Sequence, residues 1–233
     1  MNDNKTKPNL LLLHGALGTK NQFNSILSSL DRDFNVLSIN FEGHGDESSN
    51  TDFTLHGFTD NIITFLNQKN IDKTHILGYS MGGYVALNLA ITNPEMVKSI
   101  ITLGTKFEWD PQISAREIQM LNPQKIQEKV PAFVKHLENI HPANHWKELL
   151  IKTAGFIEGL GNGKGLDNSL LAKISHKVLV FLGNEDKMVS REESEKLAQL
   201  IPNGTLEIID GFRHEIDKND LSVLIPIIKR LVH

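Results

Sequence analysis

The sequence contains no cysteine, no long hydrophobic run and no excess of charge of one sign. Without cysteine the chain can form no disulfide, carry no thiolate nucleophile and bind no metal through sulfur. The apolar run near its start, residues 10–13, is far shorter than the about 18 residues that a membrane-spanning helix needs. The polar residues before that run also lack the layout of a signal peptide. We therefore expect a cytoplasmic protein with no membrane partner.

The charges nearly balance, because 24 Lys and Arg residues face 28 Asp and Glu residues, for a formal net charge of −4. This composition gives no basic surface of the kind that binds nucleic acid. With 233 residues, of which 39% are hydrophobic, the chain can bury roughly 70% of the surface that it exposes when unfolded. We expect one large domain or two small ones and a small molecule as partner. No feature of the sequence fixes an oligomeric state.

Short apolar runs alternate with amphipathic stretches along much of the chain. The apolar runs predict strands, and the stretches with helical spacing predict helices. Strands are predicted at residues 9–13, 34–39, 74–77, 97–103, 178–182 and 205–209. Helices are predicted at residues 22–30, 58–68, 83–92, 192–200 and 220–231. Alternation of this kind favours an α/β fold whose parallel sheet is covered by helices on both faces.

The alternation stops between about residues 106 and 172, where the apolar residues recur at helical spacing. Prolines at positions 111, 123, 131 and 142 divide this stretch into several short helices. The glycine-rich residues 159–165 are typical of a flexible return. We expect residues 106–172 to be a helical cap inserted into an α/β core made of residues 1–105 and 173–233. Ordinary crossover helices are the alternative.

The segment GYSMGG, residues 78–83, follows a predicted strand and precedes a predicted helix. A serine in a G-x-S-x-G turn at such a junction is typical of a nucleophile elbow. Gly78 and Gly82 would leave room for the sharp turn, and the Ser80 hydroxyl would stand clear of the sheet. The Met81 N–H would then lie at a helix N-terminus, where an anion is stabilised. A pentapeptide of this pattern also occurs by chance, so its strand and helix context carries the prediction.

A serine hydroxyl becomes a good nucleophile only when a base removes its proton and an acid orients that base. His214 follows the predicted strand at residues 205–209, and Asp186 follows the strand at residues 178–182. Along the chain these residues occur in the order Ser80, Asp186, His214, which is the order used by the architecture that has a nucleophile elbow between a strand and a helix. Taken singly, His214 would be interpreted as a surface histidine and Asp186 as a turn former. Together they predict a Ser–His–Asp triad.

Acyl transfer also needs donors for the oxyanion that develops in the transition state. The turn HGALG, residues 14–18, follows the first predicted strand and offers the Ala16 main-chain N–H, with Leu17 as the nearest alternative. Met81 would supply the second N–H. We expect His14 to be a structural hydrogen-bonding residue rather than a catalytic one.

Five segments together resemble the α/β-hydrolase fold superfamily: LLLLHGALG, EGHGDES, ILGYSMGGYVAL, VLVFLGNEDKMV and GFRHE. They occur in the order that this family has, and they cover the chain apart from residues 106–172. The resemblance implies a mostly parallel sheet of eight strands, a cap after the sixth strand, Ser80 as nucleophile, His214 as base and Asp186 as orienting acid. Because only eight residues precede Asn9, we expect the family's antiparallel N-terminal hairpin to be missing or reduced.

One departure from the family lies in residues 40–48, NFEGHGDES. Many relatives have Asp-x-Arg-Gly-His-Gly-x-Ser here, so this chain lacks the arginine and its potential salt bridge. We expect His44 to be a structural residue. The elbow also resembles those of the menaquinone-pathway synthase and the pimeloyl-ester esterase of the family. The first of these has an arginine after the second elbow glycine, where this chain has Tyr84, and the predicted cap has a single arginine, Arg116.

The acyl pocket is predicted from apolar side chains near the elbow and in the cap, with packing among cap helices as the alternative for each. The candidates are Leu17, Tyr84, Trp109, Phe133, Trp146 and Phe156. We expect no metal and no cofactor, because Pro142 interrupts the His141–His145 pair and no acidic ligands accompany it. The Gly161–Gly165 segment lacks the context of a phosphate loop.

The sequence predicts a carboxylesterase-type serine hydrolase that cleaves a small ester through an acyl-enzyme. Cleavage of a thioester or a carbon–carbon bond, as in the menaquinone-pathway synthase, is an alternative. A non-catalytic receptor that uses the same cleft is a second alternative from a different class, although such a protein would not need a strained elbow.

Overall fold

The structure, a computed structural model, describes residues 7–232. The expectations about the polar N-terminus concern residues that include 1–6, which lie outside the described part. The predicted core consists of residues 1–105 and 173–233. Its outermost residues, 1–6 and 233, also lie outside the described part.

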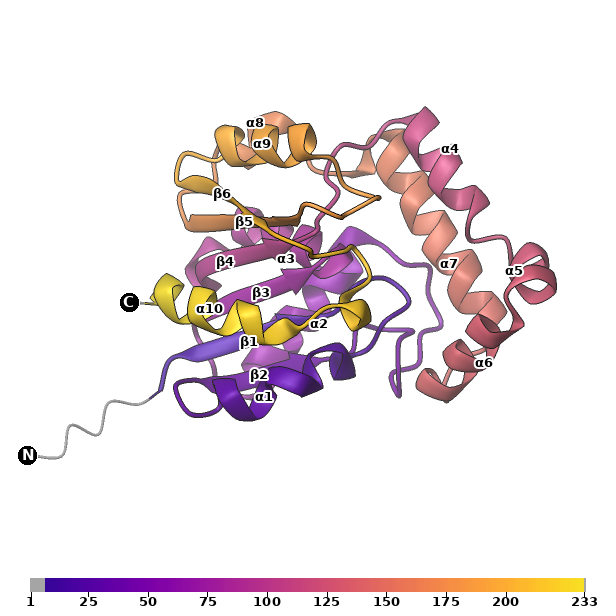
Figure 1. Cartoon of the computed structure of the whole chain (residues 1–233), viewed down its shortest axis with the longest axis horizontal. Helices are drawn as coiled ribbons and strands as arrows, with labels where there is room; N and C mark the ends of the chain where they lie inside the picture. Colours follow the sequence, from indigo (N-terminus) through magenta and orange to yellow (C-terminus); the bar gives the residue numbers. More distant parts are fainter. Residues whose placement is uncertain (1–6, 233) are drawn as a thin grey trace, which may run out of the picture.

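The centre of the fold is a parallel sheet of six strands in the order β2-β1-β3-β4-β5-β6 (Figure 1). The strands are β1 (Asn9–Leu13), β2 (Asn35–Ile39), β3 (Thr74–Tyr79), β4 (Val97–Leu103), β5 (Lys177–Gly183) and β6 (Gly204–Ile209). All six predicted strands are present, with ends that differ by no more than two residues. Within residues 7–232 the sheet has six parallel strands and not the eight that the family resemblance implied.

The described part of the chain contains ten α-helices. They are α1 (Asn24–Leu30), α2 (Leu55–Gln68), α3 (Met81–Thr92), α4 (Pro111–Gln119), α5 (Pro123–Lys129), α6 (Pro131–Ile140), α7 (Trp146–Gly159), α8 (Asn168–Leu171), α9 (Arg191–Leu200) and α10 (Leu224–Val232). Helix α2 begins at Leu55, before the predicted start at residue 58, because the Thr54 hydroxyl accepts a hydrogen bond from the Gly57 N–H and caps it. Pro111, Pro123 and Pro131 each stand in the first turn of a helix, which confirms that prolines divide this stretch.

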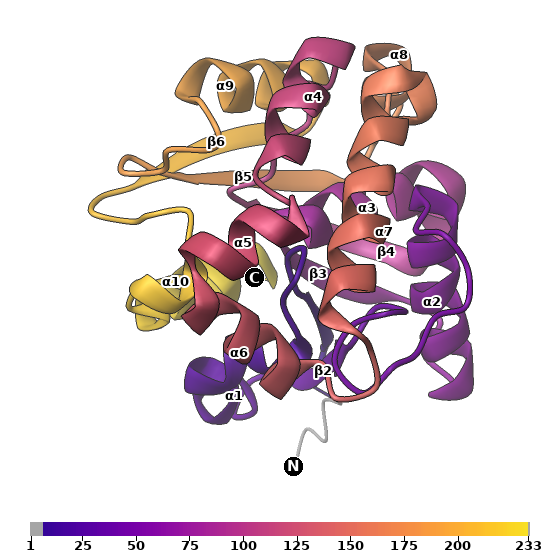
Figure 2. The same cartoon turned by 90° about the vertical axis from the view of Figure 1, so that its right-hand side faces the viewer.

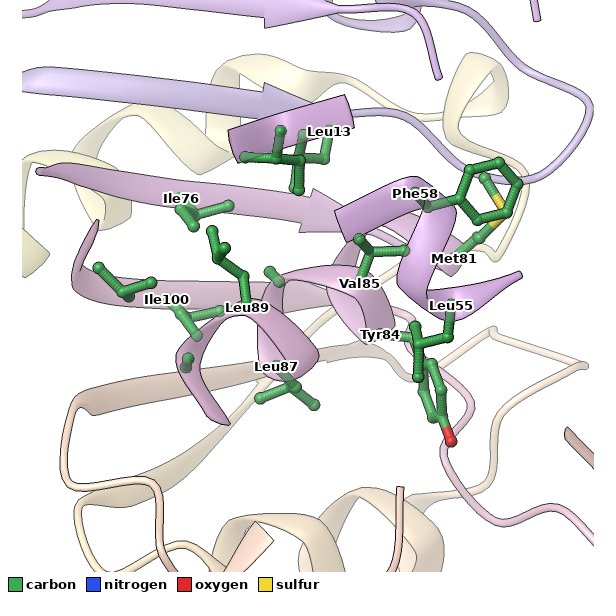
Figure 3. Close-up of a cluster of buried hydrophobic side chains, with 14 of the residues drawn as sticks. Leu13, Leu55, Phe58, Ile76, Met81, Tyr84, Val85, Leu87, Leu89 and Ile100 are labelled. Carbon is green, nitrogen blue, oxygen red and sulfur yellow. The ribbon is translucent and has the colours of Figure 1, made fainter. Parts of the chain in front are cut away.

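Side chains that alternate along β1 divide the core into two layers, one on each face of the sheet. Leu11 and Leu13 pack with helices α2, α3 and α9, whereas Leu10 and Leu12 pack with α1 and α10. Figure 3 shows the first of these layers around α3, where Val85 and Leu89 lie against Ile76 and Ile100. Because both faces are covered, β3 is buried over its whole length.

Helices α4–α7 form a group of their own beside the carboxyl ends of the strands (Figures 1 and 2). The chain enters this group after β4 and returns to the sheet at β5 through the π-helical turn Leu160–Lys164 and α8. Gly163 has a φ of 85°, so the return is a distinct turn and not a continuation of α7. None of the helices in residues 7–232 has the length and hydropathy needed to cross a membrane.

Candidate active site

The predicted nucleophile lies in a sharp turn between β3 and α3. Strand β3 ends at Tyr79 and α3 begins at Met81, so Ser80 alone connects them, with φ 50° and ψ −114°. A positive φ is costly for a residue with a side chain, and it occurs where the surrounding structure holds it. A Cβ on Gly78 would lie 2.4 Å from the Gly83 nitrogen, and one on Gly82 would lie 2.4 Å from the Leu13 oxygen. Both positions therefore require glycine.

The backbone of Ser80 is fixed to the end of the neighbouring strand β4. Its N–H donates to the Leu103 carbonyl at 2.8 Å, and its carbonyl accepts a hydrogen bond from the Thr105 hydroxyl at 3.1 Å. Because the first N–H groups of a helix have no acceptor within the helix, the Met81 N–H at the start of α3 is available to a ligand. The turn therefore presents a hydroxyl and an amide donor from adjacent residues.

The predicted acid and base form a hydrogen-bonded pair that is almost fully buried. Asp186 follows β5 and His214 follows β6, and Oδ2 of the aspartate lies 2.8 Å from Nδ1 of the histidine. The other oxygen of Asp186 accepts hydrogen bonds from the backbone N–H groups of Met188 at 2.8 Å and Val189 at 2.9 Å. An aspartate that accepts at Nδ1 leaves Nε2 of His214 as the acceptor nitrogen of a neutral imidazole. That nitrogen can take a proton from a hydroxyl group.

Two residues near this pair were not identified from the sequence. Gly104, with φ 56°, packs so closely that a Cβ would lie 3.0 Å from Oδ2 of Asp186 and 3.3 Å from Nδ1 of His214. The Tyr79 hydroxyl donates to the His214 carbonyl at 2.9 Å. The sequence signal for Gly104 is its place directly after a strand, which is where the other site residues also lie. Both residues restrict the position of His214.

The turn after β1 carries the predicted oxyanion donor Ala16. The Gly18 N–H donates to the Gly15 carbonyl at 3.1 Å, and the Gly15 N–H donates to Oε1 of Gln22 at 3.0 Å. Leu17 has φ 58°, which adds a second non-glycine residue with strained backbone at the site. Gln22 was not predicted, because its sequence position gives no sign that it reaches back to the turn.

Three buried histidines connect this turn to the loop after β2 and to the segment between α6 and α7. Their ring centroids are 5.0 Å apart for His14 and His44 and 5.8 Å apart for His44 and His141. Nε2 of His14 accepts a hydrogen bond from the Phe41 N–H at 3.0 Å, and Nδ1 of His141 accepts one from the Gly45 N–H at 2.7 Å. These contacts are structural, as expected for His14 and His44. Nothing in the sequence indicated that His141 takes part in them.

Burial lowers the pKa of all three imidazoles. The pKa of His14 falls to about 4, chiefly because the ring is desolvated. Burial, with a smaller effect of the neighbouring His14, holds the pKa of His44 well below its ordinary value, and burial also lowers the pKa of His141. Among the described residues, Nε2 of His44 has no hydrogen-bond partner. The cluster is therefore neutral at pH 7.

Glu42 stands where many relatives have the arginine of their loop motif. Its carboxylate accepts hydrogen bonds from the hydroxyls of Ser49 and Thr51, each at 3.3 Å, and its N–H donates to the side chain of Asn61 at 2.8 Å. Further along the loop, Asp46 accepts a hydrogen bond from Asn40. This loop is therefore held by hydrogen bonds around Glu42 instead of an arginine salt bridge.

A cavity of about 800 Å³ is lined by several of the predicted residues, although Asp186 and Met81 are not among them. Ser80, His214, Ala16 and Leu17 lie on its sheet side, and residues of α4, α6 and α7 form its other walls. Of the predicted pocket residues, Leu17 and Phe133 line it. Its size lies within the range of small-molecule sites, and most of the surface that its walls expose is apolar, although about half of the lining residues are polar or charged.

The other four predicted pocket residues do not line this cavity. Trp146 is buried among Ile126, Val134, Leu137 and Leu150, which fixes the packing of α5, α6 and α7. Phe156 faces the sheet and contacts Phe58 with ring centroids 5.3 Å apart. Packing of the helices, the alternative left open for each residue, therefore describes both.

Tyr84 and Trp109 line a different hollow, near the return from α7 to α8. The Tyr84 hydroxyl accepts a hydrogen bond from the Leu166 N–H at 2.7 Å, and Figure 3 shows this hydroxyl pointing away from the core cluster. Residue 84 therefore holds the returning chain.

Comparisons with known proteins agree with this architecture. A family model described as the alpha/beta hydrolase fold matches residues 8–153. A putative carbamate hydrolase, RutD, from Pseudomonas savastanoi pv. phaseolicola is 24% identical over 91% of this chain and 89% of its own length. A putative esterase/lipase from Haemophilus influenzae is 21% identical over 97% of this chain and 83% of its own.

Among solved structures, NosK from Streptomyces actuosus superposes with a TM-score of 0.82 at 19% identity, covering 97% of each chain. At that identity the likeness concerns the fold alone, whereas the family model covers more than half of the chain. The chain therefore belongs to the α/β-hydrolase fold family and is a hydrolase.

Proposed function

We propose that this protein is a serine hydrolase that cleaves a small carboxylic ester through an acyl-enzyme. In this mechanism Oγ of Ser80 attacks the acyl carbon while Nε2 of His214 takes its proton. Asp186 holds His214 in the tautomer that this step needs, and the Ala16 and Met81 N–H groups stabilise the oxyanion. His214 then protonates the leaving alcohol, and a water molecule attacks the acyl-enzyme with His214 again acting as base.

One observation carries this proposal: Ser80 and His214 line the same cavity, and the histidine is bound through Nδ1 to a buried aspartate. A binding protein gains nothing from holding a serine at a φ of 50° beside an oriented imidazole. The strain and the oriented base are typical of an activated nucleophile.

We also propose that residues 106–172 act as a cap over this cavity. Phe133 and Ile157 from α6 and α7 face the same space as Ser80. A cap of this kind excludes water and selects the substrate by shape. The bond cleaved is proposed to be an ester. A carbamate, like an ester, has a carbonyl carbon that a serine can attack, so a carbamate is a second candidate. The relative named as a putative carbamate hydrolase supports it.

The test is covalent labelling with a fluorophosphonate probe, followed by hydrolysis of p-nitrophenyl esters of increasing chain length. Wild-type protein is compared with Ser80→Ala, His214→Ala and Ser28→Ala, the last being an exposed serine of α1. We expect labelling of the wild type and of the Ser28 variant only, and a loss of several orders of magnitude in kcat for the other two. Labelling that survives Ser80→Ala would reject the mechanism. No labelling of folded wild-type protein would favour a receptor.

A further inference from the structure

One of the three carboxylates that line the cavity is nearly buried. Glu117, in helix α4, lines the cavity and is only 8% exposed. The same cavity wall includes the apolar side chains of Leu121, Phe133 and Ile157. A charged group in such surroundings loses hydration, and its interactions with other charges become stronger than in water.

The structure gives this carboxylate little compensation. Among residues 7–232, the only ion pair of Glu117 is to Nη2 of Arg116 at 3.6 Å, and that guanidinium is 69% exposed. Within the same part of the chain no donor makes a hydrogen bond to either carboxylate oxygen of Glu117. Buried carboxylates are normally paired or hydrogen-bonded. A nearly buried and weakly paired carboxylate that faces a cavity is therefore complementary to a cationic donor inside that cavity.

The other charged residues of the cavity wall do not reverse this preference. Glu215 and Asp217 add negative charge and Lys218 adds positive charge, and all three are exposed. Exposed charges are screened by water and salt, so they contribute less than a buried one. His136, also exposed, is the remaining titratable side chain in the wall apart from Tyr79 and His214. The field within the cavity is therefore negative on balance.

We propose that Glu117 is a specificity-determining residue that selects substrates carrying an ammonium group and rejects substrates carrying a carboxylate. The cation would lie in the part of the substrate remote from the bond that is cleaved, because Glu117 belongs to α4 and Ser80 to the sheet edge. This inference rests on the proposed hydrolase function for its kinetic test. Its binding test does not depend on that function.

The kinetic test uses three p-nitrophenyl esters of equal acyl length: hexanoate, 6-ammoniohexanoate and the monoester of adipate. For wild-type protein we expect kcat/KM to fall in the order ammonium, neutral, carboxylate. In Glu117→Gln the ratio of kcat/KM for the ammonium ester to that for the neutral ester should fall about tenfold. Glu138→Gln, an exposed acid of α6 outside the cavity wall, is the matched control and should leave that ratio unchanged.

The binding test uses Ser80→Ala protein and titration calorimetry with hexylammonium and hexanoate. We expect hexylammonium to bind more tightly than hexanoate, and adding Glu117→Gln should weaken hexylammonium binding about tenfold. If no ester is hydrolysed but this weakening occurs, the proposed function is wrong and the charge selection stands. Equal binding of the two ions, or a preference for the carboxylate ester, would overturn the role of Glu117, even in an active hydrolase.

Discussion

Nε2 of His141 donates a hydrogen bond to the Leu17 carbonyl at 3.0 Å, across 124 positions of the sequence. The other ring nitrogen accepts from the Gly45 N–H, so the imidazole is fixed on both sides. Leu17 follows Ala16, whose N–H is the proposed oxyanion donor. A residue between α6 and α7 therefore restrains the turn that is proposed to stabilise the transition state.

Replacing His141 is expected to slow the reaction more than it weakens substrate binding. In His141→Phe both hydrogen bonds are lost, the Leu17 turn relaxes, and kcat should fall about tenfold while KM changes less than about twofold. His141→Gln retains a donor and an acceptor and should recover part of kcat. Steady-state kinetics with a p-nitrophenyl ester, with the exposed His56→Asn as control, would measure this. An unchanged kcat in His141→Phe would show that the turn holds its own shape.

Gly104→Ala is expected to damage the acid–base pair directly. The new methyl group would contact Asp186 and His214, and alanine is strained at a φ of 56°. We expect kcat to fall about a hundredfold, since a small displacement of the base is costly, and the unfolding free energy to fall by about 1–2 kcal/mol.

Gly163→Ala provides the matched control for that experiment. Gly163 has a φ of 85°, but a Cβ there meets no heavy atom within 4 Å. It should therefore lose a similar amount of stability, about 1 kcal/mol, without a comparable loss of kcat. Equal kinetic effects in the two variants would contradict a specific role for the space beside the acid–base pair.

Replacing each of the two tyrosines of the chain should have a different effect, because Tyr79 lies at the cavity and Tyr84 at the return segment. Tyr84→Phe leaves the Leu166 N–H without its acceptor, so the unfolding free energy should fall by about 1–2 kcal/mol with little change in kcat/KM. Tyr79→Phe removes the donor to the His214 carbonyl, so kcat should fall about fivefold. Urea unfolding and ester kinetics measure both. A large rise in KM for Tyr84→Phe would restore that residue to the substrate pocket.

Stability should fall as the pH is lowered from 6.5 toward 4. The folded protein holds the pKa of His14 at about 4, below its ordinary value of 6.5, so the unfolded state binds more protons between these two values. The stabilisation, on the order of 3 kcal/mol for this one group, is complete above pH 6.5 and is lost as the pH falls. His44 and His141 act with the same sign. The unfolding free energy, measured by urea unfolding at a series of pH values, should depend less steeply on pH in His14→Gln than in the wild type.

The sequence was sufficient for the features that depend on short segments. Each strand is an apolar run bounded by turn residues, and Gly78 is required by contacts with the nearby Gly82 and Gly83 backbone, so both could be predicted. Gly82 was predicted from the elbow pattern, although the contact that requires glycine there is with the distant Leu13 carbonyl. The contact between Asp186 and His214 could be predicted because parallel strands bring their carboxyl ends to one edge. The α/β-hydrolase resemblance rested on the same segments, and the family model confirms it.

The remaining features depend on contacts between distant segments. The sequence shows that Trp146 and Phe156 are on helices, but only the packing of α7 decides that they face other helices and the sheet. Tyr84 faces away from the cavity because Leu166 lies beside it in space. Gln22, Gly104 and Glu117 likewise acquire their positions from the folded chain, and their residue types are too common to stand out.

Residues 103–105 hold the Ser80 turn and also lead the chain out of the sheet. The Leu103 carbonyl and the Thr105 hydroxyl hold Ser80, and Gly104 between them leaves no room for a Cβ beside Asp186 and His214. The same short segment is where the chain leaves the sheet toward α4, the helix that carries Glu117. One short stretch of backbone therefore both holds the Ser80 turn and begins the segment that leads to the helix carrying Glu117.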